Sequence, residues 1–435
     1  MGQCRARYGA IAVLLVASGI AGCTDAIGAS VDDATQAPSQ DDPEPDSDDG
    51  IDGEPATYPV ARPDGSAIDV VEIDVANLGA EEIALESIWT SENEIPGTEP
   101  YPIPLALDEQ GRMLLAMNDP NHFDPRTLEY SETTRVFLWD DGDLTPLGET
   151  DPLVPDDPHR NAIAGWLGDD LAIWTESAVV QGPPAEWRKF SQRIDGDAPV
   201  LLAEGYQTDE LQRSGLQSAG TDAHPVVDGL MALSYAEEDA EGTITSFVLT
   251  VPVDGGDPMP LIENAMSPAA LDGGWVAFRT GAGGRLADVL ADTDALVYVT
   301  PDGASRDLLR IDLGQRLAMP ILTASQTRFA MQFDDSAYIG DLDGESVLRL
   351  TPGRGALPIL SDSASCGDRV LVGVKSNEPE TAVQYYLLDP EDGSSLRIPH
   401  GPMAGEPLCA GEYLVLSDYG GSSGLTTTTL ARWSE

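Results

Sequence analysis

Lysine is almost missing from this chain of 435 residues, which contains only Lys189 and Lys375. Lysine and arginine together number 23, against 75 aspartates and glutamates, so the formal net charge is −52. Such a protein repels the phosphates of nucleic acids and anionic lipid headgroups, which excludes nucleic acid as a partner. The negative charge is spread along the whole chain. This favours a solubilising surface, suited to a saline medium, over a dedicated site for cations or basic proteins.

Sequence motifs that would assign a reaction are also missing. The four histidines form no H-x-H or H-E-x-x-H motif, and no glycine-rich loop both follows a strand and opens a helix. We therefore expect no cofactor and no metal. His122, His159 and His224 nevertheless fall on or beside long loops, where a ring-shaped fold could gather them as ligands of an axial metal. Gly420–Gly424 matches the G-x-S-x-G pattern of a nucleophile elbow, but no helix follows it, so we interpret it as a flexible loop.

The N-terminus carries a short apolar run, Ile11–Val16, which follows Arg5 and Arg7 and precedes small residues that end at Cys23. The run is too short to span a bilayer, and its setting is typical of a secretory signal. It resembles a bacterial lipoprotein signal, which implies cleavage before Cys23 and attachment of lipid to the sulfur and the new N-terminus of that residue. An ordinary cleaved signal peptide is the alternative. We assign residues 1–22 to the signal and expect a lipid-anchored protein of the bacterial cell envelope, facing the periplasm or the exterior.

Residues 23–57 carry the lipidated cysteine and a segment rich in Asp, Pro and Ser that contains no aromatic residue, Lys or Arg. This composition cannot bury enough apolar surface to offset the entropy lost on ordering, and its own charge extends it. We therefore predict a disordered acidic linker over residues 23–57, followed by a folded domain over residues 58–435.

Cysteine is scarce, and the four cysteines have separate expected fates. Cys4 leaves with the signal and Cys23 receives the lipid, so Cys366 and Cys409 remain. An even pair in an oxidising compartment predicts a disulfide. The bridge would close a loop of about 43 residues and, on the chain-entropy account, stabilise the fold by about 4 kcal/mol. Two buried thiols are the alternative.

Beyond residue 60 the sequence lacks the 3.6-residue period of amphipathic helices and instead repeats a four-strand module. The module is clearest in residues 365–399, where strand patterns alternate with short turns. Asp-Gly between two hydrophobic runs is a strong signal for a β-hairpin, because both residues tolerate positive φ. In six modules such a turn separates the third and fourth strands, at Asp141-Gly142, Asp195-Gly196, Asp254-Gly255, Asp302-Gly303, Asp343-Gly344 and Asp392-Gly393.

Seven modules, spaced by roughly 40–60 residues, predict an all-β fold, a seven-bladed β-propeller of four-stranded antiparallel blades. The seventh module lacks its outer strand. We expect an N-terminal strand, residues 68–75, to complete this last blade, which would close the ring and hide two strand edges. A linear β-solenoid or two sandwiches would leave the missing strand unexplained.

Two segments resemble the WD40-like repeats of the periplasmic TolB protein and its relatives. Residues 337–351 and 251–261 each run through a hydrophobic strand into an Asp-Gly turn, and the first ends in Leu350-Thr351. The other modules follow the family in outline, and the family's Ser-Pro-Asp-Gly turn and separate N-terminal domain are missing. The resemblance implies a propeller fold, and it does not extend to TolB's particular partners.

The strand connectivity of a propeller places tight turns on one face and longer connections on the other. Binding residues in proteins are often found on long loops held by a rigid scaffold. The long connections here contain aromatic and arginine side chains, the kinds that anchor protein interfaces and stack on sugars. These candidate binding residues are Phe123, Arg126, Tyr130, Arg160, Trp187, Arg188, Tyr206 and Tyr419. Alternatively, their side chains pack down onto the blades.

We predict a lipid-anchored, non-enzymatic β-propeller, a monomer that binds an envelope protein or a glycan through its loop face. The alternative is a hydrolase or lyase with an axial site of carboxylates and histidines. A structural role in an envelope complex is a third hypothesis. An enzyme would bring titratable groups together at the axis, whereas a binding protein would show a broad patch of aromatic and arginine side chains.

Overall fold

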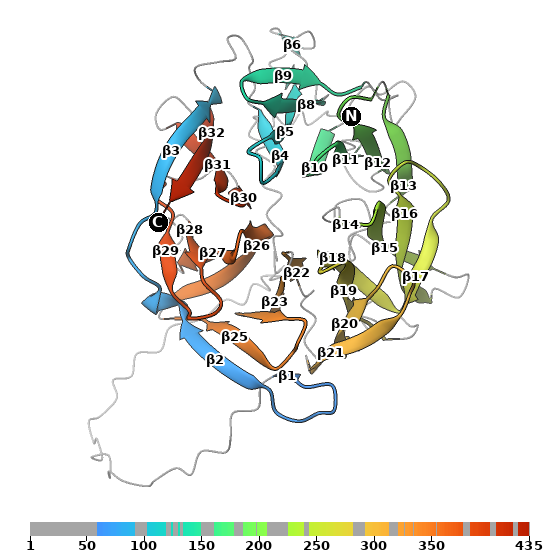
Figure 1. Cartoon of the computed structure of the whole chain (residues 1–435), viewed down its shortest axis with the longest axis vertical. Coiled ribbons are helices and arrows are strands. Elements are labelled where there is room, and N and C mark those ends of the chain that lie inside the picture. Colours follow the sequence, from blue (N-terminus) through green and yellow to red (C-terminus); the bar gives the residue numbers. More distant parts are fainter. Residues whose placement is uncertain are drawn as a thin grey trace, which may run out of the picture. The chain divides into compact units, whose positions relative to one another are not determined.

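The computed structural model describes residues 59–91, 102–118, 123–124, 129–130, 134–148, 161–177, 186–196, 198–206, 225–238, 243–281, 292–312, 321–325, 327–333, 335–353, 355–376, 383–400, 406–420 and 425–434. All of them belong to the unit Pro59–Glu435. Their strands form seven antiparallel blades around a common axis, as Figure 1 shows. The predicted seven-bladed β-propeller is confirmed.

In each blade the first strand lies nearest the axis and the fourth lies at the rim (Figure 1). Blades one to three are β4 (Ile103–Leu107), β5 (Met113–Asn118), β8 (Thr134–Asp140) and β9 (Asp143–Pro146); β10 (Asn161–Leu167), β11 (Leu171–Ser177), β12 (Glu186–Arg193) and β13 (Val200–Tyr206); and β14 (Val226–Val227), β15 (Leu230–Glu238), β16 (Ile244–Pro252) and β17 (Met259–Glu263). Blades four and five are β18 (Ala265–Leu271), β19 (Gly274–Arg279), β20 (Ala295–Val299) and β21 (Ser305–Ile311); and β22 (Ile321–Ala324), β23 (Arg328–Phe333), β24 (Ser336–Asp341) and β25 (Ser346–Thr351). Blade six is β26 (Ala356–Cys366), β27 (Arg369–Ser376), β28 (Gln384–Leu388) and β29 (Ser395–Arg397), and blade seven is β30 (Leu408–Ala410), β31 (Tyr413–Gly420), β32 (Leu425–Ser434) and β3 (Ala84–Thr90).

The central residues of the second strands are apolar because a neighbouring blade covers each of their faces. Met113–Ala116 in β5 and Trp275–Phe278 in β19 are buried without a polar interruption. The hydrophobic clusters each combine side chains of two adjacent blades, such as Ile173 with Met231. Burying each large aliphatic side chain fully contributes about 1.5–3 kcal/mol to the free energy that stabilises the folded state. Stacking of blade on blade therefore supplies most of the core.

The six Asp-Gly turns join third to fourth strands, as predicted. Glycine supplies the left-handed backbone in five of them, with φ between 62° and 94°, and only in blade one does the aspartate, Asp141, also have a positive φ, of 44°. In the turn after β12, the amide of Gly196 donates to the carbonyl of Arg193 at 2.8 Å.

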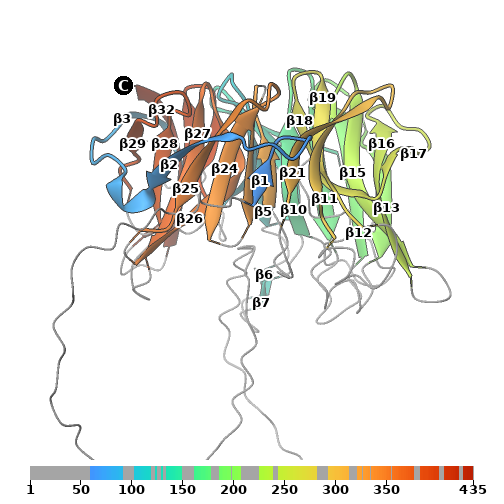
Figure 2. The same ribbon diagram turned by 90° about the horizontal axis from the view of Figure 1, so that it is seen from below.

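The first described segment, residues 59–90, runs along the rim past blades four to seven, and we call it the strap (Figure 2). Its strands β1 (Val60–Ala61) and β2 (Asp69–Asp74) add a fifth strand to blades four and five, antiparallel to β21 and parallel to β25 respectively. After the 3₁₀ turn η1 (Val75–Asn77), Glu81 and Ile83 exchange backbone hydrogen bonds with Arg397 of blade six. The strap therefore bonds to the outer strands of three blades before it reaches the seventh.

An N-terminal strand completes the last blade, but the prediction that residues 68–75 supply it is wrong. The closing strand is β3, which pairs antiparallel with β32, whereas residues 69–74 form β2 on blade five. Neither stretch alternates cleanly in polarity, so the sequence pattern does not distinguish them. The deciding side chain is Trp89, which is 3% exposed in the cluster between blades seven and one, whereas Val71 of β2 is 57% exposed.

Candidate functional site

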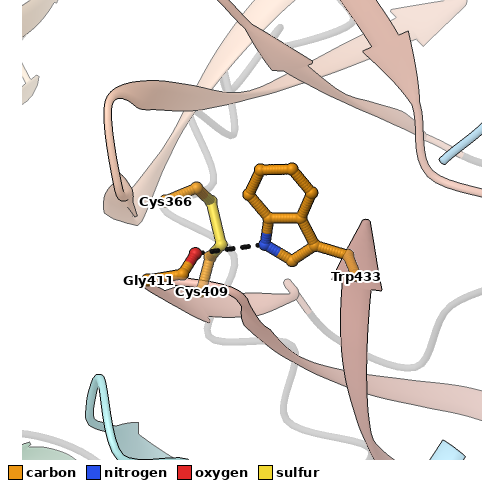
Figure 3. Close-up of a disulfide and its surroundings, with 4 residues drawn as sticks. All are labelled: Cys366, Cys409, Gly411 and Trp433. Atoms are coloured by element: carbon orange, nitrogen blue, oxygen red, sulfur yellow. Dashed lines mark hydrogen bonds between the residues drawn. A yellow bond between two sulfur atoms is a disulfide. The ribbon is translucent and has the colours of Figure 1, made fainter. Parts of the chain in front are cut away.

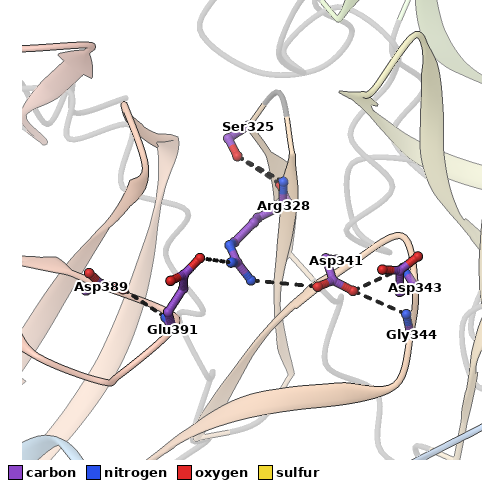
Figure 4. A network of polar contacts seen from close by, with 7 residues as sticks. All are labelled: Ser325, Arg328, Asp341, Asp343, Gly344, Asp389 and Glu391. Atoms are coloured by element: carbon purple, nitrogen blue, oxygen red, sulfur yellow. Dashed lines mark hydrogen bonds and ion pairs between the residues drawn. The ribbon is translucent and has the colours of Figure 1, made fainter.

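One face of the propeller carries the short hairpin turns, between first and second and between third and fourth strands, and we call it the turn face. Arginines on this face form ion pairs with carboxylates of neighbouring turns. Figure 4 shows Arg328 between Asp341 of its own blade, at 3.9 Å, and Glu391 of blade six, at 3.5 Å. Arg193 likewise joins Asp170 to Asp254 of the next blade, and hydrogen bonds, first to Asp254, raise the pKa of this guanidinium. Such exposed pairs are worth about 0–1 kcal/mol each, so they orient the turns more than they stabilise the fold.

Carboxylates inside the turns also have structural partners. Asp302 accepts hydrogen bonds from the hydroxyl of Thr300 and the amide of Ala304, and these lower its pKa. The amide of Ser394 donates to Asp392 at 2.7 Å and lowers the pKa of that carboxyl in the same way. The arginines and carboxylates of these turns are therefore engaged in holding the turns together.

The predicted disulfide is present between Cys366 of β26 and Cys409 of β30, with 5.2 Å between the Cα atoms and 43 residues of separation. It joins the first strands of blades six and seven beside the turn face. Both cysteines are buried, at 1% and 6% exposure. Figure 3 shows Trp433 beside the bridge, with its indole N–H donating to the carbonyl of Gly411 at 3.1 Å. The bridge therefore connects blade seven, which the strap completes, covalently to blade six.

The opposite face, which we call the loop face, carries the connections from second to third strands and from blade to blade. These connections are uneven. Residues 119–133 separate β5 from β8 and residues 280–294 separate β19 from β20, whereas β23 and β24 are joined through residues 334–335 alone. The first of these connections contains a two-stranded hairpin that the sequence did not reveal, β6 (Phe123–Asp124) paired with β7 (Glu129–Tyr130).

The structure separates the predicted binding residues into three groups. Trp187 is a core residue, 5% exposed, and its ring packs between blades two and three. This agrees with the alternative prediction that these side chains pack onto the blades, so we no longer count Trp187 as a binding residue. Arg188 on the same strand pairs with Glu204 at 3.3 Å. Four aromatic residues lie on strands that border loop-face connections: Phe123 on β6, Tyr130 on β7, Tyr206 at the end of β13 and Tyr419 near the end of β31. Arg126, Arg160, the histidines His122, His159 and His224, and Cys23 lie outside the described residues.

A charged pocket of about 590 Å³ lies at the loop-face end of blade four, and sequence reasoning missed it. Its lining combines Arg279, Arg310 and four aspartates, at positions 292, 294, 307 and 312, with Pro63 of the strap. Arg279 donates to both Asp294 and Asp307 at 2.7 Å, and the bond to Asp294 is the main cause of its raised pKa. The excess of carboxylates over guanidinium groups suits a ligand that carries positive charge.

Two buried charged residues in blade two also escaped prediction. Lys189 of β12 is 0% exposed and Glu176 of β11 is 4% exposed. The indole N–H of Trp174 donates to the Glu176 carboxylate at 3.1 Å, and the strand register sets Lys189 opposite Thr175. The same register sets Glu176 opposite Arg188, so the side chains of Lys189 and Glu176 project from opposite faces of the blade. The sequence pattern around Lys189 did not indicate that this side chain is buried.

Within the described ranges, no group of three or more His, Cys, Asp or Glu side chains is arranged to hold a metal ion. No helix in these ranges is long and apolar enough to cross a bilayer.

No family model matches this chain, and no curated protein sequence matches it significantly. Solved structures do match in fold. A puromycin-hydrolysing peptidase from Mycobacterium tuberculosis is 14% identical with a TM-score of 0.42, over 79% of this chain and 53% of that chain. TolB from Acinetobacter baumannii is 15% identical with a TM-score of 0.28, over 59% and 68%. A variant of the apocarotenoid oxygenase from Synechocystis is 9% identical with a TM-score of 0.34, over 76% and 74%.

These similar proteins have different activities. TolB structures are among them. This chain spans about half the length of the peptidase. At identities of 15% or less and TM-scores below 0.5, none of the three lends its activity or partners to this chain.

Proposed function

We propose that this protein is a lipid-anchored, extracytoplasmic binding or scaffold module that holds an envelope protein or a glycan on its loop face. The propeller is the rigid part of this module, and the connections at one end of its blades form the recognition surface. Cys23 carries the lipid, and residues 24–57 connect it to the ring.

The observation that carries this proposal is the unequal construction of the two faces. On the turn face, arginines such as Arg193 and Arg328 are engaged with the turns of adjacent blades. On the loop face, long connections join the same blades, and Tyr206 and Tyr419 lie on strands that border them. Loops on a rigid scaffold are the usual place for recognition. Tyrosine supplies both apolar contact area and a hydrogen-bonding tip, which suits a protein surface or a sugar ring.

The blade-four pocket supports the same assignment. It opens at the loop-face end of that blade, where Asp292 and Asp312 add negative charge beside the paired Arg279. A ligand with a basic side chain or an amino sugar would therefore be attracted there, and the overall charge of −52 would steer it from a distance.

The proposed acidic linker that follows Cys23 sets how far the propeller extends from the membrane. About 36 residues separate Cys23 from Pro59, and a flexible chain of that length has a root-mean-square span of roughly 30–36 Å. Repulsion among its aspartates and glutamates lengthens it. The ring is thus held clear of the headgroups, which its own charge also repels.

The test compares two variants of the purified chain as bait for envelope extracts and for a panel of immobilised glycans. One carries alanine at Phe123, Tyr130, Tyr206 and Tyr419, and the matched control carries asparagine at Asp302 and Asp392 of the turn face. We expect the first to lose the ligand that wild type retains and the second to keep it. Equal retention by both variants, or loss in the turn-face variant alone, would refute the proposal.

A further inference from the structure

The blade-four pocket contains two unpaired side chains of opposite charge. Among the residues that the structure describes, the side chains of Arg310 and Asp292 form no hydrogen bond or ion pair, with each other or with any third residue. Both are open to solvent, where a ligand can reach them. By contrast, Asp294 and Asp307 of the same pocket each accept a hydrogen bond from Arg279 at 2.7 Å. One cavity therefore offers a free guanidinium group and a free carboxylate.

The strand register explains the space between the two arginines of this pocket. Arg279 of β19 lies opposite Ala295 of β20, and Ala295 lies opposite Arg310 of β21. The row ends at Ala61 of the strap, opposite Arg310. Side chains directly opposite one another project from the same face of a sheet, so only a methyl group separates the two long side chains. Ala295 is one of the lining residues, and the room that its small side chain leaves is part of the pocket.

A buried hydroxyl group in the same pocket also lacks a partner. Thr293 lies two residues before β20, lines the pocket and is only 3% exposed. Within the described ranges, its Oγ1 atom has no hydrogen-bond partner. Buried polar groups in folded proteins are nearly always hydrogen-bonded, so we expect this hydroxyl to meet a polar atom of a bound molecule. It is evidence for a ligand that does not depend on the charges.

We infer that the blade-four pocket binds a small zwitterion, an amino acid or a short peptide, whose carboxylate pairs with Arg310 and whose ammonium group pairs with Asp292. A guanidinium group suits a carboxylate because it can donate two parallel hydrogen bonds to it. A ligand with positive charge alone would leave Arg310 unpaired and be repelled by it, and a ligand with negative charge alone would be repelled by Asp292. A cavity of about 590 Å³ is large enough for such a molecule.

This inference deepens the proposed function and rests on it in one respect, because the pocket opens at the loop-face end of its blade. The probes are L-lysine and two relatives, titrated into the full chain by isothermal titration calorimetry. The first relative, 1,5-diaminopentane, is lysine without its carboxylate, and the second, hexanoate, is lysine without its ammonium groups. We expect lysine to bind about tenfold more tightly than either, because a hydrogen-bonded pair with a charged group contributes at least that factor. The dipeptide alanyl-lysine tests whether a short peptide also fits.

Two variants remove the unpaired charges one at a time. Arg310→Gln has a matched control in Arg306→Gln on the same strand, since the Arg306 guanidinium donates to the carbonyl of Leu342 outside the pocket. Asp292→Asn has a matched control in Asp272→Asn, in the turn between β18 and β19 on the turn face. We expect each pocket variant to weaken lysine binding about tenfold and each control to leave it within about twofold.

Thr293→Val replaces the unpartnered hydroxyl with a methyl group of the same shape. We expect lysine to bind about threefold more weakly or less tightly still, the loss of one neutral hydrogen bond. The melting temperature of the ligand-free variant should not fall, because the hydroxyl has no partner in the described chain to lose. A variant that is less stable without ligand and binds lysine as wild type does would show that the hydroxyl holds an ordered water, and would overturn its place in the site.

Other results would overturn the whole inference. Binding of 1,5-diaminopentane as tight as that of lysine would show attraction of cations alone, and equal affinities of Arg310→Gln and Arg306→Gln would exclude the carboxylate contact. Binding of neither lysine nor alanyl-lysine would exclude the ligand class. A chain that captures an envelope protein or a glycan but binds no probe overturns this inference alone. A chain that binds lysine through the pocket but captures nothing overturns the proposed function alone.

Discussion

Replacing Trp89 with alanine tests how the ring is closed. Trp89 is 3% exposed, lies on the closing strand β3 and meets Trp139 of blade one with ring centroids 5.8 Å apart. Val415 and Leu430 of blade seven belong to the same cluster, so the side chain joins the last blade to the first. Truncating a buried tryptophan costs about 3–5 kcal/mol. For a domain of roughly 380 residues, a loss of about 4 kcal/mol lowers the melting temperature by about 5 °C.

The neighbouring Ile88 provides the matched control, because it lies on the same strand and is 45% exposed. We expect Ile88→Ala to change stability by at most about 0.5 kcal/mol. Thermal and guanidinium unfolding, followed by far-UV circular dichroism, measures both variants without depending on the tryptophan that is removed. If Trp89→Ala were as stable as Ile88→Ala, β3 would not be the strand that closes the propeller, and the account of the strap would fail.

Three other predictions follow from the same structure. Serine at both Cys366 and Cys409 should lower the free energy of unfolding by up to about 4 kcal/mol, because the bridge closes a loop of 43 residues, and a reductant should reproduce this loss in wild type but not in the variant. Asp302→Ala should lower the melting temperature at pH 7, and this gap should shrink only as the pH falls below about 4, because the folded-state pKa of Asp302 is depressed and its stabilising contribution is lost as the pH falls through that lowered value; an undiminished gap at the lowest pH at which the protein still folds would contradict this. Cys23→Ser should abolish incorporation of an alkyne-labelled fatty acid in bacterial cells and move the protein out of the membrane fraction, and retention of the label would exclude Cys23 as the anchor.

The repeat and its turns could be predicted from sequence because both are local. An Asp-Gly pair such as Asp141-Gly142 between apolar runs specifies a hairpin whatever surrounds it. The disulfide could also be predicted, because the expected loss of Cys4 and the expected lipidation of Cys23 leave one pair. The choice of closing strand could not, because neither residues 68–75 nor residues 84–90 alternate cleanly in polarity and only long-range packing decides between them.

The candidate site could be predicted only in outline. Aromatic content pointed to the loop face, but Trp187 packs between two blades because the cluster of Ile173 and Met231 accepts its ring. No local signal marks a polar-flanked tryptophan as buried. The blade-four pocket was missed because its lining joins Pro63 of the strap to β19, β20 and β21, which come more than 200 residues later in the sequence.

The most direct test of the two-face account is site-specific photo-crosslinking in intact cells. A photoreactive residue replaces Tyr419, beside the loop face, in one variant and Asp141, in a turn of the opposite face, in the other. The account predicts covalent adducts with envelope protein or glycan from position 419 and none above background from position 141. Adducts from position 141 alone, or equal yields from both positions, would contradict it.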